Sequence, residues 1–155
     1  MLELLFRLCC GIISAISNVT GYSYEMVNTF LFIYLEPLIL LVSGWLITYF
    51  GIKYFKSTFN KIVLGLSIVY NIIFTSVVCQ IWNFYAQFDM QTACERAYID
   101  LDTLGRITGL GYVNINLFLF IIIFIAILIF NIAIIICQKK SYQNVLLQER
   151  NLNTN

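Results

Sequence analysis

The chain has 155 residues, of which 61% are hydrophobic and 11% charged, with a formal net charge of +1 and no histidine. A soluble domain normally contains about 45–50% apolar and about 25% charged residues, so this composition excludes an ordinary water-soluble domain and requires lipid as a solvent. Without histidine, a CxxC pair or a basic stripe, the sequence predicts no catalytic or metal-binding residue, no cofactor and no nucleic-acid partner.

Residues 1–25 predict an amphipathic helix that ends in a turn. Side chains of polar or small residues recur at spacings of four and three, as expected on one face of a helix, and apolar residues occupy the rest of its circumference. We expect this helix to lie in the outer membrane interface rather than to span the bilayer. The polar face consists of Glu3, Arg7, Cys10, Ser14 and Ser17.

Three long apolar segments, residues 26–50, 62–86 and 113–138, predict transmembrane helices. Each exceeds the roughly 20 residues that cross a hydrocarbon core of about 30 Å. The third contains a stretch, residues 117–130, that is apolar on every face, which is typical of a helix largely surrounded by lipid.

Charge in the connecting segments predicts the orientation. Residues 51–61 hold three lysines and no acid, whereas residues 87–112 hold four acids and two arginines, and two lysines open the tail, residues 139–155. The positive-inside rule then places the first connection and the tail in the cytoplasm, and the N-terminus and the second connection outside. We expect this topology in a bacterial inner membrane.

A motif of threonine, glycine, tyrosine and asparagine occurs twice in the chain, with the same spacing and 88 positions apart. The upstream segments also correspond: Phe6, Cys9, Cys10, Ile13 and Ile16 align with Cys94, Ala97, Tyr98, Leu101 and Leu104, so residues 91–104 predict a second amphipathic helix. The expected fold is therefore all-α, with three transmembrane helices and two outer-face amphipathic helices in a parallel internal repeat. The repeated motif is Thr20, Gly21, Tyr24 and Asn28, followed by Thr108, Gly109, Tyr112 and Asn116.

The residue types of this motif have simple physical interpretations. The glycines can adopt the left-handed conformation that ends a helix, and the tyrosines suit the headgroup boundary. The asparagines follow one turn deeper on the same face. The motif therefore predicts turn formation and anchoring, with ligand recognition as the alternative.

A polar seam is predicted between the first two spans. Glu36 lies near the middle of the first span, where a carboxylate faces protein or water rather than lipid, and Pro37 leaves the carbonyl of Ile33 without its helical donor, so we expect a kink. Antiparallel pairing places Thr29 level with Asn83, Glu36 with Ser76 and Ser43 near Asn71. Glu36 is expected to be protonated or to be held by the hydroxyls of Thr75 and Ser76. The seam comprises Thr29, Glu36, Ser43, Asn71, Thr75, Ser76 and Asn83. The alternative is that these residues line a pore or a proton path.

Three cysteines, Cys9, Cys10 and Cys94, fall on the predicted outer side. That compartment permits a disulfide between the two amphipathic helices, and packing as free thiols is the alternative.

Two functions remain open at this stage. The topology, with three spans, an outer N-terminus and a charged cytoplasmic tail, is similar to that of one class of phage holins. That resemblance implies a pore former, holin-like or a small channel. The composition favours a non-enzymatic membrane protein that self-associates or joins a complex, with lipid and other membrane subunits as partners.

Overall fold

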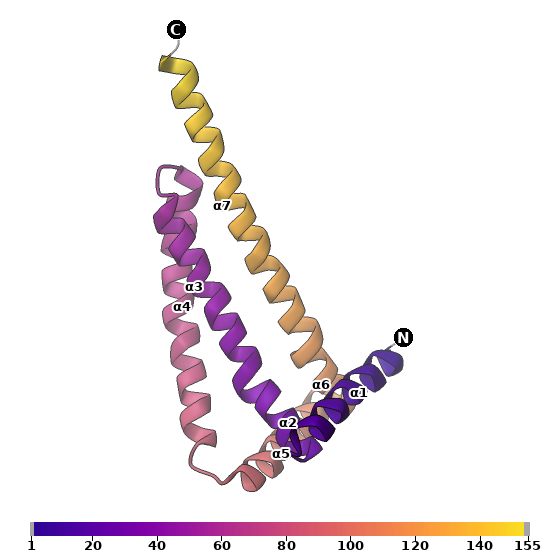
Figure 1. The fold of residues 1–155 in the computed structure, drawn as a ribbon. Coiled ribbons are helices and arrows are strands. Elements are labelled where there is room, and N and C mark those ends of the chain that lie inside the picture. The colour runs from indigo at the N-terminus through magenta and orange to yellow at the C-terminus, as the bar shows by residue number, and fades with distance from the viewer. Residues whose placement is uncertain (1, 154–155) are drawn as a thin grey trace. The chain divides into compact units, whose positions relative to one another are not determined.

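The computed structural model describes residues 2–153, with side chains for residues 4–152, and every regular element in that range is a helix (Figure 1). Three helical runs, Tyr24–Lys53, Thr58–Tyr85 and Gly111–Leu152, are long and apolar enough to cross a membrane. The all-α class and the three candidate spans are confirmed. The elements are α1 (Leu2–Thr20), α2 (Tyr24–Thr29), η1 (Phe30–Leu35), α3 (Glu36–Lys53), α4 (Thr58–Tyr85), α5 (Met90–Thr108), α6 (Gly111–Leu117), η2 (Phe118–Ile123) and α7 (Phe124–Asn153).

Two boundaries differ from the sequence-based expectation. The connection between α3 and α4 is only four residues, 54–57, where residues 51–61 were expected. Helix α7 continues to Asn153, where the solvated tail from residue 139 was expected to be helical only over residues 145–150. Residues 139–153 contain no proline or glycine and several strong helix formers, so nothing in them stops the helix. The side chain of Glu3, expected on the polar face of the first helix, lies outside the described side chains.

Local capping fixes the ends of the short and amphipathic helices. Gly21 and Gly109 have φ values of 76° and 71°, so both adopt the predicted left-handed conformation directly after α1 and α5. Ser23 accepts a hydrogen bond from the backbone of Met26 and caps α2, and Asp89 accepts one from the backbone of Thr92 and caps α5.

The chain divides into two compact units, which are described separately. Unit 1 contains the residues up to Leu38 together with Cys79–Ile125, and unit 2 contains Ile39–Val78 together with the residues from Ala126 onward. In unit 1, α1 packs on α2 and α6, and α5 packs on the same two helices (Figure 1). In unit 2, α3 and α4 are joined by the short turn. The side chain of Asn131 of α7 donates to Ser43 of α3, and the side chain of Asn60 of α4 donates to the backbone of α7.

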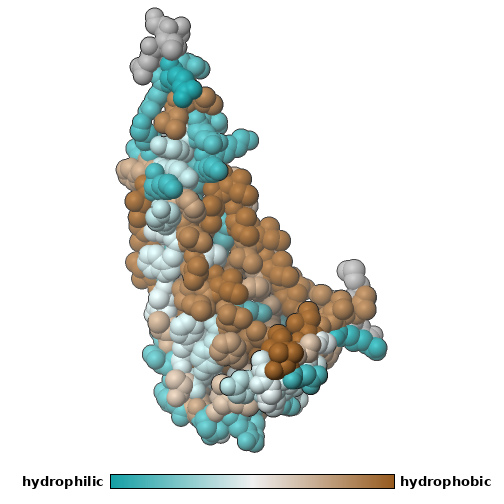
Figure 2. All heavy atoms as spheres, viewed as in Figure 1, coloured by the Kyte–Doolittle hydropathy of each residue, from teal (hydrophilic) through white to brown (hydrophobic). Residues whose placement is uncertain are grey.

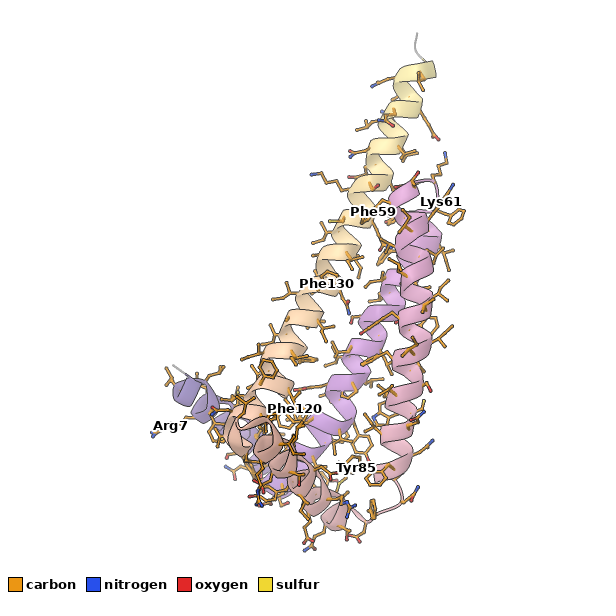
Figure 3. All side chains as sticks on the ribbon, turned by 180° about the vertical axis from the view of Figure 1, so that it is seen from behind. Arg7, Phe59, Lys61, Tyr85, Phe120 and Phe130 are labelled. Atoms are coloured by element: carbon orange, nitrogen blue, oxygen red, sulfur yellow. The ribbon has the colours of Figure 1, made fainter. Side chains whose placement is uncertain are left out.

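Both units expose large apolar side chains. In unit 1, Leu4 and Ile107 are 64% and 78% exposed, and in unit 2, Phe130 is 64% exposed (Figure 3). Figure 2 shows brown, apolar residues over much of the visible surface of the long helices, with hydrophilic residues on α5 and toward the C-terminal end of α7. Apolar surface of this extent is typical of contact with lipid or with another protein.

Candidate functional site

Polar side chains hold α3 against α4 within unit 2. The fully buried Asn71 donates from Nδ2 to the carbonyl oxygen of Gly44 and to Oγ1 of Thr48, both over 2.9 Å. The hydroxyls of Thr48 and Ser67 lie 3.0 Å apart. Both hydroxyl residues are also buried. Both N–H groups of the Asn71 side chain therefore donate from α4 to α3 of the same chain.

These pairs lie close to the predicted register. Ser43 was expected near Asn71, and Asn71 reaches the next residue, Gly44, and Thr48 one turn further along α3. Side chains in a helix lean toward its N-terminus. Helix α4 runs antiparallel to α3, so the N-terminal end of α4 lies beside the C-terminal end of α3. A side chain of α4 therefore contacts α3 residues with higher residue numbers than the α3 residue that is level with its own backbone.

The third long helix contributes polar side chains that the sequence-based seam omitted. Asn131 donates from Nδ2 to the hydroxyl of Ser43 over 2.8 Å. Gln138 donates from Nε2 to the carbonyl oxygen of Ile47 over 3.0 Å, and Asn60 donates to the carbonyl oxygen of Gln138 over 3.1 Å. The amide side chains are all buried. Asn131 and Gln138 carry amide side chains in an otherwise apolar segment. These two residues were the sequence signal that could have predicted the contacts of α7.

The remaining seam residues have different environments. Thr29 is buried and Glu36 half-buried in unit 1. Oγ1 of Thr75 is buried and has no hydrogen-bond partner among the described residues. Ser76 and Asn83 are exposed on another face of α4 from Asn71. Thr75 and Ser76 belong to unit 2 and Glu36 to unit 1, so the expected contact between them stays a prediction.

The carbonyl left without a donor by Pro37 has a specific partner. In unit 1 the indole Nε1 of Trp82 donates to the carbonyl oxygen of Ile33 over 2.8 Å. The ring of Trp82 also contacts Tyr34, with ring centroids 6.2 Å apart. The helix adopts π-helical geometry over η1, directly before Pro37. A side chain on α4 thus satisfies the backbone group that proline leaves open.

Three side-chain pairs join residues 88 positions apart, two from the first span and one from the turn after it to residues of the third long helical run. In unit 1, Phe32 and Phe120 stack with ring centroids 4.3 Å apart. In unit 2, Asn131 binds Ser43, and the rings of Tyr54 and Tyr142 stack at 4.9 Å. Successive pairs are eleven positions apart, about three helical turns. Equivalent positions of the two segments therefore face one another.

The tyrosines of the repeated motif contact equivalent positions of the amphipathic helices. Tyr24 donates from its hydroxyl to Sγ of Cys10 over 3.3 Å, and the ring of Tyr112 packs on that of Tyr98 at 4.8 Å. Asn116 donates to the hydroxyl of Tyr112 over 3.4 Å. These contacts fix both rings against the helices that precede them.

The turn between α3 and α4 is bound to α7. Lys56 donates to Glu149 over 2.8 Å, and the hydroxyls of Ser57 and Ser141 lie 2.5 Å apart. The hydrogen bond and charge of Glu149 raise the pKa of Lys56 above its ordinary value.

The described residues contain no group of three or more histidine, cysteine or acidic side chains that could hold a metal ion. The five cysteines are free thiols, and burial raises the pKa of Cys9, with smaller contributions from Cys10 and Glu36. Comparison with known protein families, with curated proteins and with solved structures gives no match.

Proposed function

We propose that the chain is a non-enzymatic integral membrane protein with three transmembrane helices, which acts by self-association or as a subunit of a membrane complex. Helix length and composition support the three spans. The lysines around the 54–57 turn and after α7's apolar part support cytoplasmic placement of those ends, and the acidic α5 segment supports an outer location.

We further propose that the membrane part is a parallel internal repeat. The bounds of α1 and α5, of η1 and η2, and the starts of α3 and α7 all differ by the same 88 positions as the sequence motif. The left-handed glycines and the three equivalent side-chain pairs support the same assignment. In this arrangement α1 and α5 lie at the outer interface, each before an inward-running span.

One observation carries the proposal of assembly: α4 has an exposed polar stripe at membrane depth. Ser76, Gln80 and Asn83 are exposed and recur at spacings of four and three, on one face of the helix. Polar side chains that are exposed on membrane helices generally face protein or water rather than lipid. A second copy or another subunit would cover this stripe.

The exposed stripe also supports the alternative function, a pore whose lumen forms between copies. The buried amides Asn71 and Asn131 favour assembly without a pore, because they bond within one chain. The expected pore lining that includes Glu36 stays a prediction.

Reconstitution separates the two functions. The assembly function predicts a stable oligomer or complex in neutral detergent, shifted to smaller species by Gln80→Leu with Asn83→Leu, and no ion flux in liposomes. The control is Val77→Leu, at an exposed position on another face of the same helix. Flux that the double variant removes would establish the pore instead. A monodisperse monomer with neither partner nor flux would contradict both.

A further inference from the structure

Unit 1 contains a cavity of about 660 Å³ between α2, η1, α5, α6 and the last turns of α4. This volume lies within the range of small-molecule sites. Its apolar part includes Leu101 and Leu104 of α5 and Leu119 of η2. Tyr85 and Phe120, both labelled in Figure 3, also line it.

Aromatic rings form much of the wall. Four tyrosines, Tyr24, Tyr85, Tyr98 and Tyr112, line the cavity, together with the stacked pair of phenylalanines 32 and 120. Three of the tyrosine hydroxyls are held: Tyr24 by Cys10, Tyr112 by Asn116 and Tyr85 by Asp100 over 3.1 Å. The rings are therefore preorganised, and aromatic faces attract cations.

The charge of the lining has one sign. Glu25 and Asp100 line the cavity, and no lysine or arginine among the described residues does. An adjoining cavity shares Glu25 and Tyr98 and adds Glu95, again without a base. Negative charge beside aromatic faces favours a positive headgroup, and it disfavours a phosphate.

We propose that this cavity binds an amphiphilic ammonium ion that carries no phosphate. Its ammonium head lies among the tyrosine rings near Glu25 and Asp100, and its hydrocarbon part lies against the leucines of α5 and η2. The absence of a base in the lining argues against a phospholipid as occupant, because the phosphate would have no partner there.

Equilibrium dialysis of the purified full chain in neutral maltoside micelles tests the site, with radiolabelled decyltrimethylammonium as probe and decyl sulfate as the anionic comparison. The cation is expected to bind saturably, at one per chain. Glu25→Gln with Asp100→Asn is expected to weaken binding about tenfold, and so is Tyr98→Leu, whereas Tyr98→Phe retains the ring and the affinity. The matched control is Asp102→Asn, because Asp102 is an acid of α5 that pairs with Arg106 and does not line the cavity.

Three outcomes would overturn the proposal. Equal binding of the cation and the sulfate would show partition into micelles rather than recognition. Unchanged affinity in the acid and Tyr98→Leu variants would place the cation elsewhere. Displacement by phosphatidylethanolamine, but not by phosphatidylglycerol, at equal mole fraction would assign the cavity to a phospholipid. Because binding is measured in micelles, the result is independent of topology and of assembly through α4.

Discussion

The two units of the chain are stabilised in different ways. Among the described residues, unit 1 buries seven apolar and two polar side chains, whereas unit 2 buries four apolar and eight polar ones. Lipid is as apolar as leucine, so helices in hydrocarbon gain little from apolar contact and depend on close packing and interhelical hydrogen bonds. The buried polar contacts of unit 2 are therefore of the kind that joins helices in membranes.

The charges of the two units differ in the same sense. Unit 1 has three arginines against seven acids, a net charge of −4, and unit 2 has six basic residues against one acid, a net charge of +5. The formal charge of +1 for the whole chain hides this separation. The positive-inside rule depends on lysines and arginines rather than on net charge, and unit 2 holds six of these residues against three in unit 1.

The largest expected effect is on the close packing of unit 1. A Cβ added at Gly105 of α5 would lie 2.7 Å from the backbone carbon of Gly111, which cannot move aside as a flexible side chain could. Gly105→Ala is expected to destabilise unit 1 by about 1–3 kcal/mol, measured by thermal unfolding in maltoside micelles. Gly65→Ala in α4 is the control, because its Cβ meets open space and it should be neutral or stabilising. Equal effects of the two substitutions would contradict the packing assigned to Gly105.

The next effect tests the polar contacts of unit 2. Asn71→Leu removes the bonds to Gly44 and Thr48 and is expected to cost about 1–2 kcal/mol, as judged by the midpoint of denaturation in dodecyl sulfate. Ile72→Leu, on an exposed position beside it, is expected to change little. A stability gain in Asn71→Leu would mean that apolar packing, not hydrogen bonding, holds these helices.

A smaller effect concerns the carbonyl of Ile33. Trp82→Phe keeps an aromatic ring but removes the donor, and is expected to cost about 1 kcal/mol. Pro37→Ala restores a backbone N–H near this carbonyl, so it should reduce the cost of Trp82→Phe in a double-mutant cycle. Additive effects of the two substitutions would show that Trp82 stabilises the helix by ring packing alone.

The smallest effect is at the start of α5. Hydrogen bonds from the backbone and hydroxyl of Thr92 lower the pKa of Asp89. Because the folded pKa is below the unfolded value of about 3.9, the carboxylate stabilises α5 above that pH, and this contribution is lost as the pH falls through the folded pKa. The protection of the first-turn amides against hydrogen exchange, relative to their intrinsic rates at each pH, should therefore fall in acid for the native chain, and less so for Asp89→Asn, which caps without titrating. Identical acid profiles would exclude a role of Asp89 as a charged cap.

Much of the architecture follows from the sequence, and the exceptions have physical causes. The left-handed glycines and the three candidate spans follow from residue type and apolar length. The bond from Asn71 to Thr48 does not, because it depends on the direction in which side chains lean along their helices. Asn131 and Gln138 were missed because the third span was treated as surrounded by lipid, although single amides in such a run indicate a partner. The role of Trp82 required the structure, since Pro37 predicts an open carbonyl but not the group that fills it.

The difference between the two units is tested most directly by labelling intact cells with a membrane-impermeant maleimide. In a background with all five cysteines replaced, one variant carries Asp102→Cys in unit 1 and another carries Lys56→Cys in unit 2. The account predicts that position 102 is labelled from outside, and that position 56 is labelled only after the membrane is made permeable. Labelling of position 56 but not 102 in intact cells would reverse the orientation, and labelling of both would contradict a membrane between them.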